Sequence, residues 1–244
     1  MEEEKKTEET AAQAGTKPVR KRKKRAYSPE ELYRLRRPKM AFDGQWKKAF
    51  GCPPPTGYWI IWGNSGNGKS SFVMQLAKYL CRFGKVFYNS VEEDTEASFI
   101  DNVRRCRMEE VGDRFKCAKL TLEELEERMS DPRKEDIYII DSFQAFKLTS
   151  SGPMAYDKLC ERHPGRLVIF ISRADGRKPK GRPADNCAWD ASVKIWVEGF
   201  RAYCKGRFTP KTGASFTIWE EGAAMYDQGN HKNIKEQAYE NNNE

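Results

Sequence analysis

The chain has 244 residues, of which 38% are hydrophobic and 33% are charged, so it is long enough for one α/β domain with polar extensions. It has no run of about eighteen apolar residues, and its acidic first residues lead into no apolar stretch, so we expect neither a transmembrane helix nor a secretory signal. The first 50 residues hold 15 Lys and Arg against 8 Asp and Glu, so most of the formal charge of +8 lies in this N-terminal part of the chain.

The seven cysteines are scattered along the chain, and only two histidines are present. No two cysteines have the spacing C-x-x-C, so we predict neither a zinc ribbon or finger nor a framework of disulfides. This cysteine usage fits a reducing compartment, and we expect a cytoplasmic protein.

Residues 1–27 are predicted to be a disordered arm, acidic at first and then basic. Within it, residues 17–25 hold seven basic side chains in nine positions. Three interpretations remain open for this run: a solvated tail, a contact to a nucleic-acid phosphate backbone, or a nuclear localisation signal.

Residues 28–55 are predicted to be a helical linker. The run Ser28-Pro29-Glu30-Glu31 has the pattern of a helix N-terminus with a capping box, and Pro38 should end that helix. A second short amphipathic segment follows over 42–50. The linker could pack on a neighbouring subunit or on the core of its own chain.

Residues 56–228 alternate between apolar strands and amphipathic helices, which predicts a mostly parallel central sheet flanked by helices. From residue 193 the apolar residues alternate with polar ones, which predicts a C-terminal antiparallel β extension. Residues 229–244 are predicted to be a flexible tail. The fold class is therefore α/β; the predicted strands are 58–62, 86–90, 137–140, 167–172, 193–198, 200–205 and 215–220, and the predicted helices are 71–83, 95–110 and 121–129.

A complete G-x-x-x-x-G-K-S motif lies between a predicted strand and a predicted helix, as a phosphate-binding loop requires. Glycines let the backbone N–H groups wrap a phosphate, and the helix N-terminus adds its positive dipole end. Lys69 should reach the β and γ phosphates of ATP, and the Ser70 hydroxyl should bind Mg²⁺. The predicted ATP-binding residues are Gly63, Asn64, Ser65, Gly66, Asn67, Gly68, Lys69, Ser70 and Ser71.

Asp141 ends a predicted apolar strand and is the expected second support for Mg²⁺. The next residue is Ser142, whereas AAA+ proteins usually place a catalytic Glu there, and the D-x-x-G pattern of GTPases is absent. The catalytic carboxylate should then come from the Val91-Glu92-Glu93-Asp94 run, which follows the strand after the P-loop helix. A Glu at this edge of the sheet can orient the water that attacks the γ-phosphate.

The order of the P-loop, then S-V-E-E, then I-I-D-S-F-Q resembles the RecA/RadA/DnaB group of ATPases, and most of all the ATPase core of RadA. The later runs V-K-I-W-V-E-G and K-G-R-F resemble passages of the same family. The likeness covers about residues 40–226 and implies a RecA-like fold. Without the zinc module and protease-like domain of RadA, the compact chain resembles stand-alone members from phage and mobile elements.

The resemblance also implies roles for single residues. Glu92 matches the catalytic glutamate of the family and Asp141 matches the Walker B aspartate. Lys205 and Arg207 match a cationic pair that reaches into the nucleotide site of a neighbouring subunit, which would make the protein a homo-oligomer, as a ring or a filament. The family often senses the γ-phosphate with Gln or His after the strand at 167–172, where this chain has Ser172 and Arg173.

Residues 173–182 carry five basic side chains and one acid after a core strand, and we predict a mobile, basic, Gly-rich loop. In RecA-like proteins the corresponding loop holds DNA, so we expect a salt-sensitive contact to DNA, with single-stranded DNA favoured and Trp189 as the nearest aromatic residue. A second, less basic candidate segment is 147–158. The predicted contacts are Arg173, Arg177, Lys178, Lys180 and Arg182.

The sequence therefore predicts a Mg²⁺-dependent ATPase that oligomerises and binds DNA in recombination, repair or replication. Two alternatives stay open. One is an ATP-dependent switch resembling KaiC that recruits protein partners, and the other is a small-molecule kinase whose lid is the basic loop.

Overall fold

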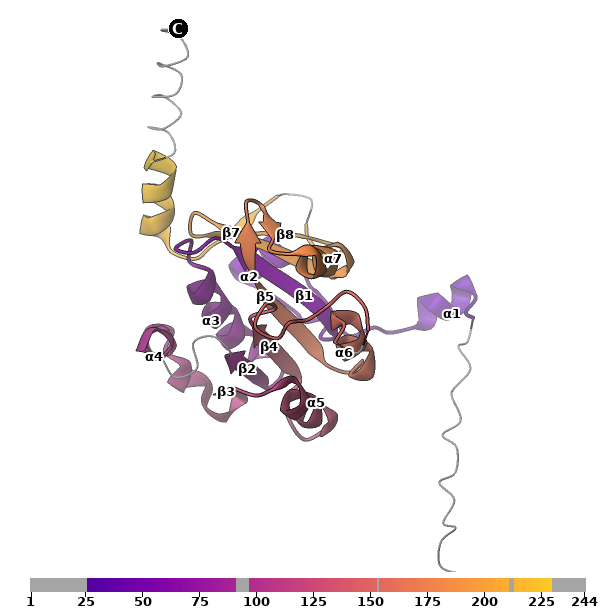
Figure 1. The fold of residues 1–244 in the computed structure, drawn as a ribbon. Helices are drawn as coiled ribbons and strands as arrows, with labels where there is room; N and C mark the ends of the chain where they lie inside the picture. The colour runs from indigo at the N-terminus through magenta and orange to yellow at the C-terminus, as the bar shows by residue number, and fades with distance from the viewer. Residues whose placement is uncertain (1–25, 91–96, 153, 211–212, 230–244) are drawn as a thin grey trace, which may run out of the picture. The chain divides into compact units, whose positions relative to one another are not determined.

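The computed structural model describes residues 26–90, 97–152, 154–210 and 213–229 (Figure 1). Residues up to Arg37 form one unit, and residues from Pro38 onward form another. In the first unit, helix α1 (Pro29–Arg34) begins at the predicted capping box, where the Ser28 hydroxyl accepts a hydrogen bond from the Glu31 N–H and the Glu31 carboxylate accepts one from the Ser28 N–H. Most of the predicted arm and tail, residues 1–25 and 230–244, lies outside the described residues.

The second unit is built on a sheet with the strand order β3-β2-β4-β5-β1-β7-β8-β9, in which β6 pairs with β5. The strands from β3 to β7 in this order are parallel, whereas β8 and β9 add antiparallel to the edge. The predicted α/β fold class, with its C-terminal antiparallel extension, is confirmed. The strands are β1 (Gly57–Gly63), β2 (Val86–Ser90), β3 (Phe115–Ala118), β4 (Ile137–Asp141), β5 (Leu167–Asp175), β6 (Lys178–Pro179), β7 (Val193–Glu198), β8 (Arg201–Gly206) and β9 (Ser215–Thr217).

Helices cover both faces of this sheet, and each face has its own core (Figure 1). Because side chains alternate along a strand, Trp59 and Ile61 of β1 enter one core and Ile60 enters the other. On the first face lie α2 (Gly44–Phe50), α3 (Lys69–Leu80), α4 (Ala97–Arg105) and the 3₁₀ helix η1 (Met108–Arg114). On the second lie α5 (Leu122–Ser130), α6 (Tyr156–Arg162) and α7 (Arg182–Asp190).

The segment after Pro38, predicted as part of a linker, packs into the core of its own chain. Phe42 and Phe50 are buried, and the Trp46 ring stacks on Tyr79 of α3 with centroids 4.7 Å apart. Two hydrogen bonds from Arg82 to the Asp43 carboxylate, at 3.0 and 2.7 Å, hold the pKa of Asp43 below its ordinary value. Of the two packing modes left open for the linker, this part of the chain takes the intramolecular one.

Several element boundaries differ from the predictions. The helix predicted over 95–110 ends at Arg105, because Arg107 takes a left-handed backbone conformation with φ 52° before η1 begins. The strand predicted over 215–220 ends at Thr217, and residues 220–229 form a helix instead. Among the unpredicted elements, β3, α6 and α7 are short segments in which few apolar residues mark a period.

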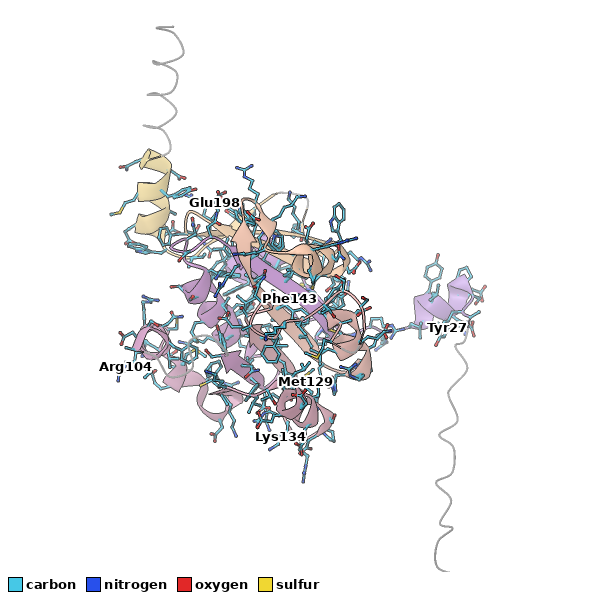
Figure 2. All side chains as sticks on the ribbon, viewed as in Figure 1. Tyr27, Arg104, Met129, Lys134, Phe143 and Glu198 are labelled. Atoms are coloured by element: carbon cyan, nitrogen blue, oxygen red, sulfur yellow. The ribbon has the colours of Figure 1, made fainter. Side chains whose placement is uncertain are left out.

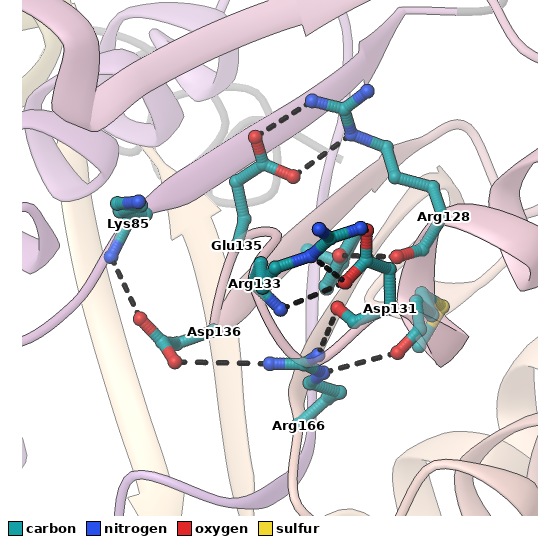
Figure 3. Close-up of polar contacts among 9 residues, drawn as sticks. Lys85, Arg128, Asp131, Arg133, Glu135, Asp136 and Arg166 are labelled. Atoms are coloured by element: carbon teal, nitrogen blue, oxygen red, sulfur yellow. Dashed lines mark hydrogen bonds and ion pairs between the residues drawn. The ribbon is translucent and has the colours of Figure 1, made fainter.

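Ion pairs fasten the edge of the sheet at which β2 and β4 begin (Figure 3). Arg128 donates two hydrogen bonds, of 2.8 and 2.7 Å, to the buried carboxylate of Glu135. Burial opposes the ionisation of Glu135, but these bonds outweigh it and lower its pKa. Asp136 accepts a hydrogen bond from the Lys85 N–H at 3.0 Å and lies 3.7 Å from Arg166, so the start of β4 is tied to its neighbours.

Candidate functional site

The P-loop motif folds as the predicted strand, loop and helix. Gly63 ends β1 so close to β7 that a Cβ at this position would lie 2.4 Å from the Val197 carbonyl oxygen. Gly66 and Gly68 have φ values of +77° and +88°, which other residues rarely adopt. Lys69 opens α3, so the loop delivers its backbone directly to a helix N-terminus.

The turn between β7 and β8 forms hydrogen bonds to the P-loop. The Gly199 N–H donates to Asn67 Oδ1 at 2.8 Å, and the Phe200 N–H donates to the Asn67 carbonyl at 3.2 Å. Asn67 Nδ2 donates in turn to the Ser65 carbonyl at 3.2 Å. Asn67 was predicted to contact ATP, and the structure uses its side chain to fix the shape of the loop.

Replacing Gly68 by alanine should weaken both folding and nucleotide binding. The new Cβ would lie 2.9 Å from the Phe200 ring on a backbone with φ +88°, and strain of this kind costs about 1–3 kcal/mol. Thermal unfolding and equilibrium binding of ATP check this prediction. Gly66→Ala is the matched control, because Gly66 shares the positive φ but would meet nothing within 4 Å, and a Gly68→Ala melting temperature at or above that of Gly66→Ala would contradict the prediction.

Two side chains of α4 brace the start of α3, and sequence reasoning missed both. Asn102 is buried, and its Nδ2 donates to the Ser70 carbonyl at 2.9 Å. Arg105 Nη2 donates to the Ser71 hydroxyl at 2.9 Å and to Asn102 Oδ1 at 2.8 Å. Ser71, a predicted ATP-binding residue, therefore already bonds to a guanidinium that would add positive charge beside a phosphate.

A pocket of about 660 Å³ lies over the P-loop, and we call it the phosphate pocket. Most of its lining comes from the motif, as predicted. The remainder comes from Ser71 of α3, the end of β5 and the segment after β6. The lining residues are Gly63, Asn64, Ser65, Gly66, Gly68, Lys69, Ser70, Ser71, Arg173, Ala174 and Lys180.

Asp141 is the last residue of β4, and its Oδ2 accepts a hydrogen bond of 2.6 Å from the Tyr88 hydroxyl. In the sheet β5 lies between β4 and β1, so Asp141 approaches the P-loop across two strand spacings, about 10 Å. That separation suits a carboxylate that supports Mg²⁺ through water, because Mg²⁺ usually keeps several of its waters. Tyr88 is a further residue that the sequence did not single out.

The arrangement fits a triphosphate with Mg²⁺. Glycines 66 and 68 have the left-handed backbone of an amide cradle, Ser70 lines the same pocket, and Asp141 ends a neighbouring strand. Ser70 and Asp141 are the residues that would hold the ion. When bound, Mg²⁺ would neutralise phosphate charge.

Glu92, the predicted catalytic carboxylate, lies outside the described residues. The strand that leads to it is described: β2 ends at the buried Ser90, which pairs with Asp141 in the sheet. The chain therefore leaves β2 level with the predicted metal support. The role of Glu92 remains a prediction.

Lys205 is level with Ile60 in the middle of β1, and Arg207 follows the end of β8, where its N–H donates to the Ser192 carbonyl at 3.4 Å. Lys205 pairs with Lys194, and the next residue along β8 pairs with Val193, which pairs with Trp59 near the start of β1. Neither side chain lines the phosphate pocket of its own chain. Their action on a neighbouring subunit stays a prediction.

The segment predicted as a mobile basic loop is a hairpin. The end of β5 pairs with β6 around a turn at Gly176, and α7 follows directly. We call residues 173–182 the basic hairpin. Of its predicted nucleic-acid contacts, Arg173 and Lys180 line the phosphate pocket, whereas Arg177, Lys178 and Arg182 do not.

Gln144 ties the basic hairpin to the segment after Asp141. Its Nε2 donates to the Ser172 hydroxyl and to the Lys180 carbonyl, both at 2.8 Å, and its Oε1 accepts from the Arg173 N–H at 3.2 Å. Sequence reasoning used Gln144 only as part of a motif. The structure makes it the connection between the two ends of the hairpin and the strand that carries Asp141.

A second pocket, of about 880 Å³, lies beside α3 and shares Ser71 with the phosphate pocket. We call it the side pocket. Its walls are largely aromatic and apolar, and the Phe200 and Trp219 rings meet edge to face with centroids 5.1 Å apart. Arg105 stands between the two pockets, since it lines this one and bonds to Ser71.

The described part of the chain shows neither a cluster of metal-binding side chains nor a helix that could span a membrane. There, no three His, Cys, Asp or Glu side chains form a group that could hold a metal ion. No described helix has the length and apolar character needed to cross a membrane.

No protein-family model and no curated protein matches the chain. Among solved structures, it is similar to the flagellar accessory protein FlaH from Methanocaldococcus jannaschii, with 17% identity, a TM-score of 0.50 and coverage of 73% of this chain and 90% of that one. It is also similar to a KaiC-like protein from Pyrococcus horikoshii OT3, with 17% identity, a TM-score of 0.49 and coverage of 75% and 92%. The likeness to FlaH, together with the P-loop, shows a RecA-like P-loop ATPase fold; it does not single out RadA.

Proposed function

We propose that this chain is a Mg²⁺-dependent ATPase that works as a homo-oligomer on single-stranded DNA. The observation that supports it most is the convergence on one edge of the sheet of the P-loop, Asp141 and a basic hairpin. Two cations of that hairpin, Arg173 and Lys180, line the phosphate pocket itself. Nucleotide and nucleic acid would therefore meet on a shared structural element.

In the hydrolytic step, Lys69 neutralises charge that develops on the transferred phosphoryl group. Glu92 orients the attacking water, as its place after β2 implies. Arg173 lies just after residues 167–172. At this place, the family that the chain resembles often has the residue that senses the γ-phosphate, and we assign this role to Arg173. Asp141, held by Tyr88, keeps its carboxylate directed by a short hydrogen bond.

The side pocket supports ATP as the nucleotide. A nucleotide whose phosphates lie over Ser70 and Ser71 can place its base beside Phe200 and Trp219, which line the adjoining pocket. Aromatic walls suit a purine, because stacking on a ring needs no polar partner. Arg105 stands between the base and the phosphates.

The position of Lys205 and Arg207 supports the proposed oligomer. Neither cation lines the phosphate pocket of its own chain, so we assign both to the nucleotide of another subunit. Charge supplied across an interface would couple hydrolysis to assembly.

The direct test is the rate of ATP hydrolysis by the full chain with and without single-stranded DNA. We expect hydrolysis that needs Mg²⁺ and rises with the DNA. Slow turnover that ignores DNA would instead favour the ATP-dependent switch, and phosphoryl transfer to a metabolite would favour the kinase.

Neutralising Arg177 and Lys178 together should weaken DNA binding without lowering the basal rate of hydrolysis. Neither residue lines the phosphate pocket, and each lost phosphate contact reduces the slope of log K against log salt by about 0.7 for single strands. DNA titrations at several salt concentrations measure the slope. Lys180→Ala is the contrasting variant, because Lys180 lines the pocket and its loss should lower both DNA binding and hydrolysis; equal behaviour of the two variants would contradict the assignment.

A further inference from the structure

We propose that the bases of a single-stranded nucleic acid stack on three aromatic side chains that cross the sheet side by side: Trp62 of β1, Trp196 of β7 and Tyr203 of β8. We call them the aromatic row. This inference rests on the nucleic-acid part of the proposed function and names the surface that would read the bases.

The sheet register places the three rings together. Trp62 pairs with Trp196, and Trp196 pairs with Tyr203, so all three side chains project from the same face on adjacent strands. Along β7, Val193, Ile195 and Val197 are buried in the core on the α3 side. Trp196 therefore projects from the opposite face of the sheet, which is the face on which α7 packs.

The rings are accessible, and the two indole N–H groups already have hydrogen-bond acceptors. Tyr203 is 38% exposed, Trp62 and Trp196 are half-buried, and the two indole centroids lie 5.9 Å apart. The Trp62 indole N–H donates to the Arg177 carbonyl at 3.0 Å, and that of Trp196 donates to the Glu198 carboxylate at 3.2 Å. What the row offers to a ligand is thus aromatic surface.

Cations flank the row. Lys194 of β7 pairs with Lys205 of β8. Lys194 lies two residues from Trp196 and Lys205 lies two residues from Tyr203, so both lysines project from the same face as the row. On the other side, the Trp62 bond brings the turn of the basic hairpin against the row. The strands β1, β7 and β8 and the basic hairpin hold two acids: Glu198, which accepts from Trp196 and lies at the end of β7 (Figure 2), and Asp175 in the hairpin. Lys194 Nζ also donates to the Trp189 carbonyl at 2.7 Å.

This charge favours a polyanion over a second copy of the chain. A self-contact through the row would bring together two surfaces with the same excess of positive charge, and like charges repel. Aromatic rings on adjacent strands with flanking Lys and Arg are how sheet-based modules stack two or three bases of a single strand. Stacking tolerates any base, so the site should show little sequence preference.

The test compares two oligomers of equal length and charge, a 20-residue oligothymidine and its abasic counterpart, bound to the full chain without nucleotide. We expect wild type to bind oligothymidine at least about tenfold more tightly. Trp196→Ala combined with Tyr203→Ala should erase that difference while leaving abasic affinity unchanged. Trp219→Ala is the control, since Trp219 is 48% exposed but lines the side pocket on the other face, and it should keep the difference.

The outcomes separate the two proposals. If wild type binds both oligomers equally, the aromatic row plays no part while nucleic-acid binding stands. If it binds neither, both proposals fail. If the double variant changes the oligomeric state by sedimentation and keeps the preference for thymidine, the row is an interface between copies.

A second measurement uses wild-type protein alone, in case the double variant unfolds. Oligothymidine carrying 4-thiothymidine is photocrosslinked, and the attached peptides are identified by mass spectrometry. We expect crosslinks within residues 57–63 and 193–206. Crosslinks confined to residues 173–182 would overturn the inference.

Discussion

Lys69→Ala is expected to reduce ATP hydrolysis by at least about 10²-fold, the loss that follows removal of one preorganised donor to developing charge. Lys69 opens α3 and lines the phosphate pocket, where an ammonium can reach the terminal phosphates. The measurement is phosphate release at saturating ATP and Mg²⁺, because a defect that persists at saturation lies in the chemical step.

Lys48→Ala is the matched control for this variant. Lys48 is an exposed lysine of α2 that lines neither pocket, so its loss should leave the rate unchanged. A Lys69→Ala protein that folds normally and keeps more than half of the wild-type rate would show that the loop does not bind the triphosphate in the way we propose.

Asp141→Asn is expected to lower the rate by about 10²-fold and to raise the Mg²⁺ concentration needed for half-maximal hydrolysis, by analogy with other single preorganised charges in phosphoryl transfer. The substitution keeps the volume of the side chain but removes the negative charge that supports the ion. Titration of the rate with Mg²⁺ separates the two effects, since excess metal should restore only the part due to binding.

Tyr88→Phe provides the comparison for Asp141. It removes the 2.6 Å hydrogen bond to the carboxylate and keeps the charge, so the loss should be well below that of Asp141→Asn. If Tyr88→Phe were as damaging as Asp141→Asn, the hydrogen bond rather than the metal-supporting charge would carry the effect. Unchanged Mg²⁺ dependence in Asp141→Asn would contradict its role.

Local patterns in the sequence were sufficient for the fold class and the phosphate pocket. The strand, glycine loop and helix around Gly63–Ser70 are consecutive in the chain, so periodicity and the motif define them without knowledge of the tertiary structure. The same holds for Asp141 at the end of an apolar strand, and for the capping box at Ser28.

The contacts that the sequence could not predict join residues far apart in the chain. Asn102 reaches the Ser70 carbonyl across 32 positions, and Gln144 reaches the Lys180 carbonyl across 36. Such pairs depend on which elements pack together, and one sequence carries no record of that. The aromatic row shows the same limit, because its members are neighbours only through the register of β1, β7 and β8.

For the basic hairpin, the composition predicted the basic charge correctly but not the secondary structure. Its glycine and charges predicted a mobile loop, yet the strand β5 continues to Asp175 and β6 returns beside it. Backbone pairing and the bonds from Gln144 stabilise that form, and neither has a signature in hydrophobic periodicity. As a result, two of its cations line the phosphate pocket.

We expect the backbone amides after Gly66, together with Lys69, to hold the triphosphate of ATP. A crystal structure of the full chain with a non-hydrolysable ATP analogue and Mg²⁺ tests it most directly. We predict that the β and γ phosphates lie within hydrogen-bond distance of the amides of residues 66–70 and of Lys69 Nζ. Phosphates bound elsewhere, or a phosphate pocket left empty at saturating analogue, would contradict the account.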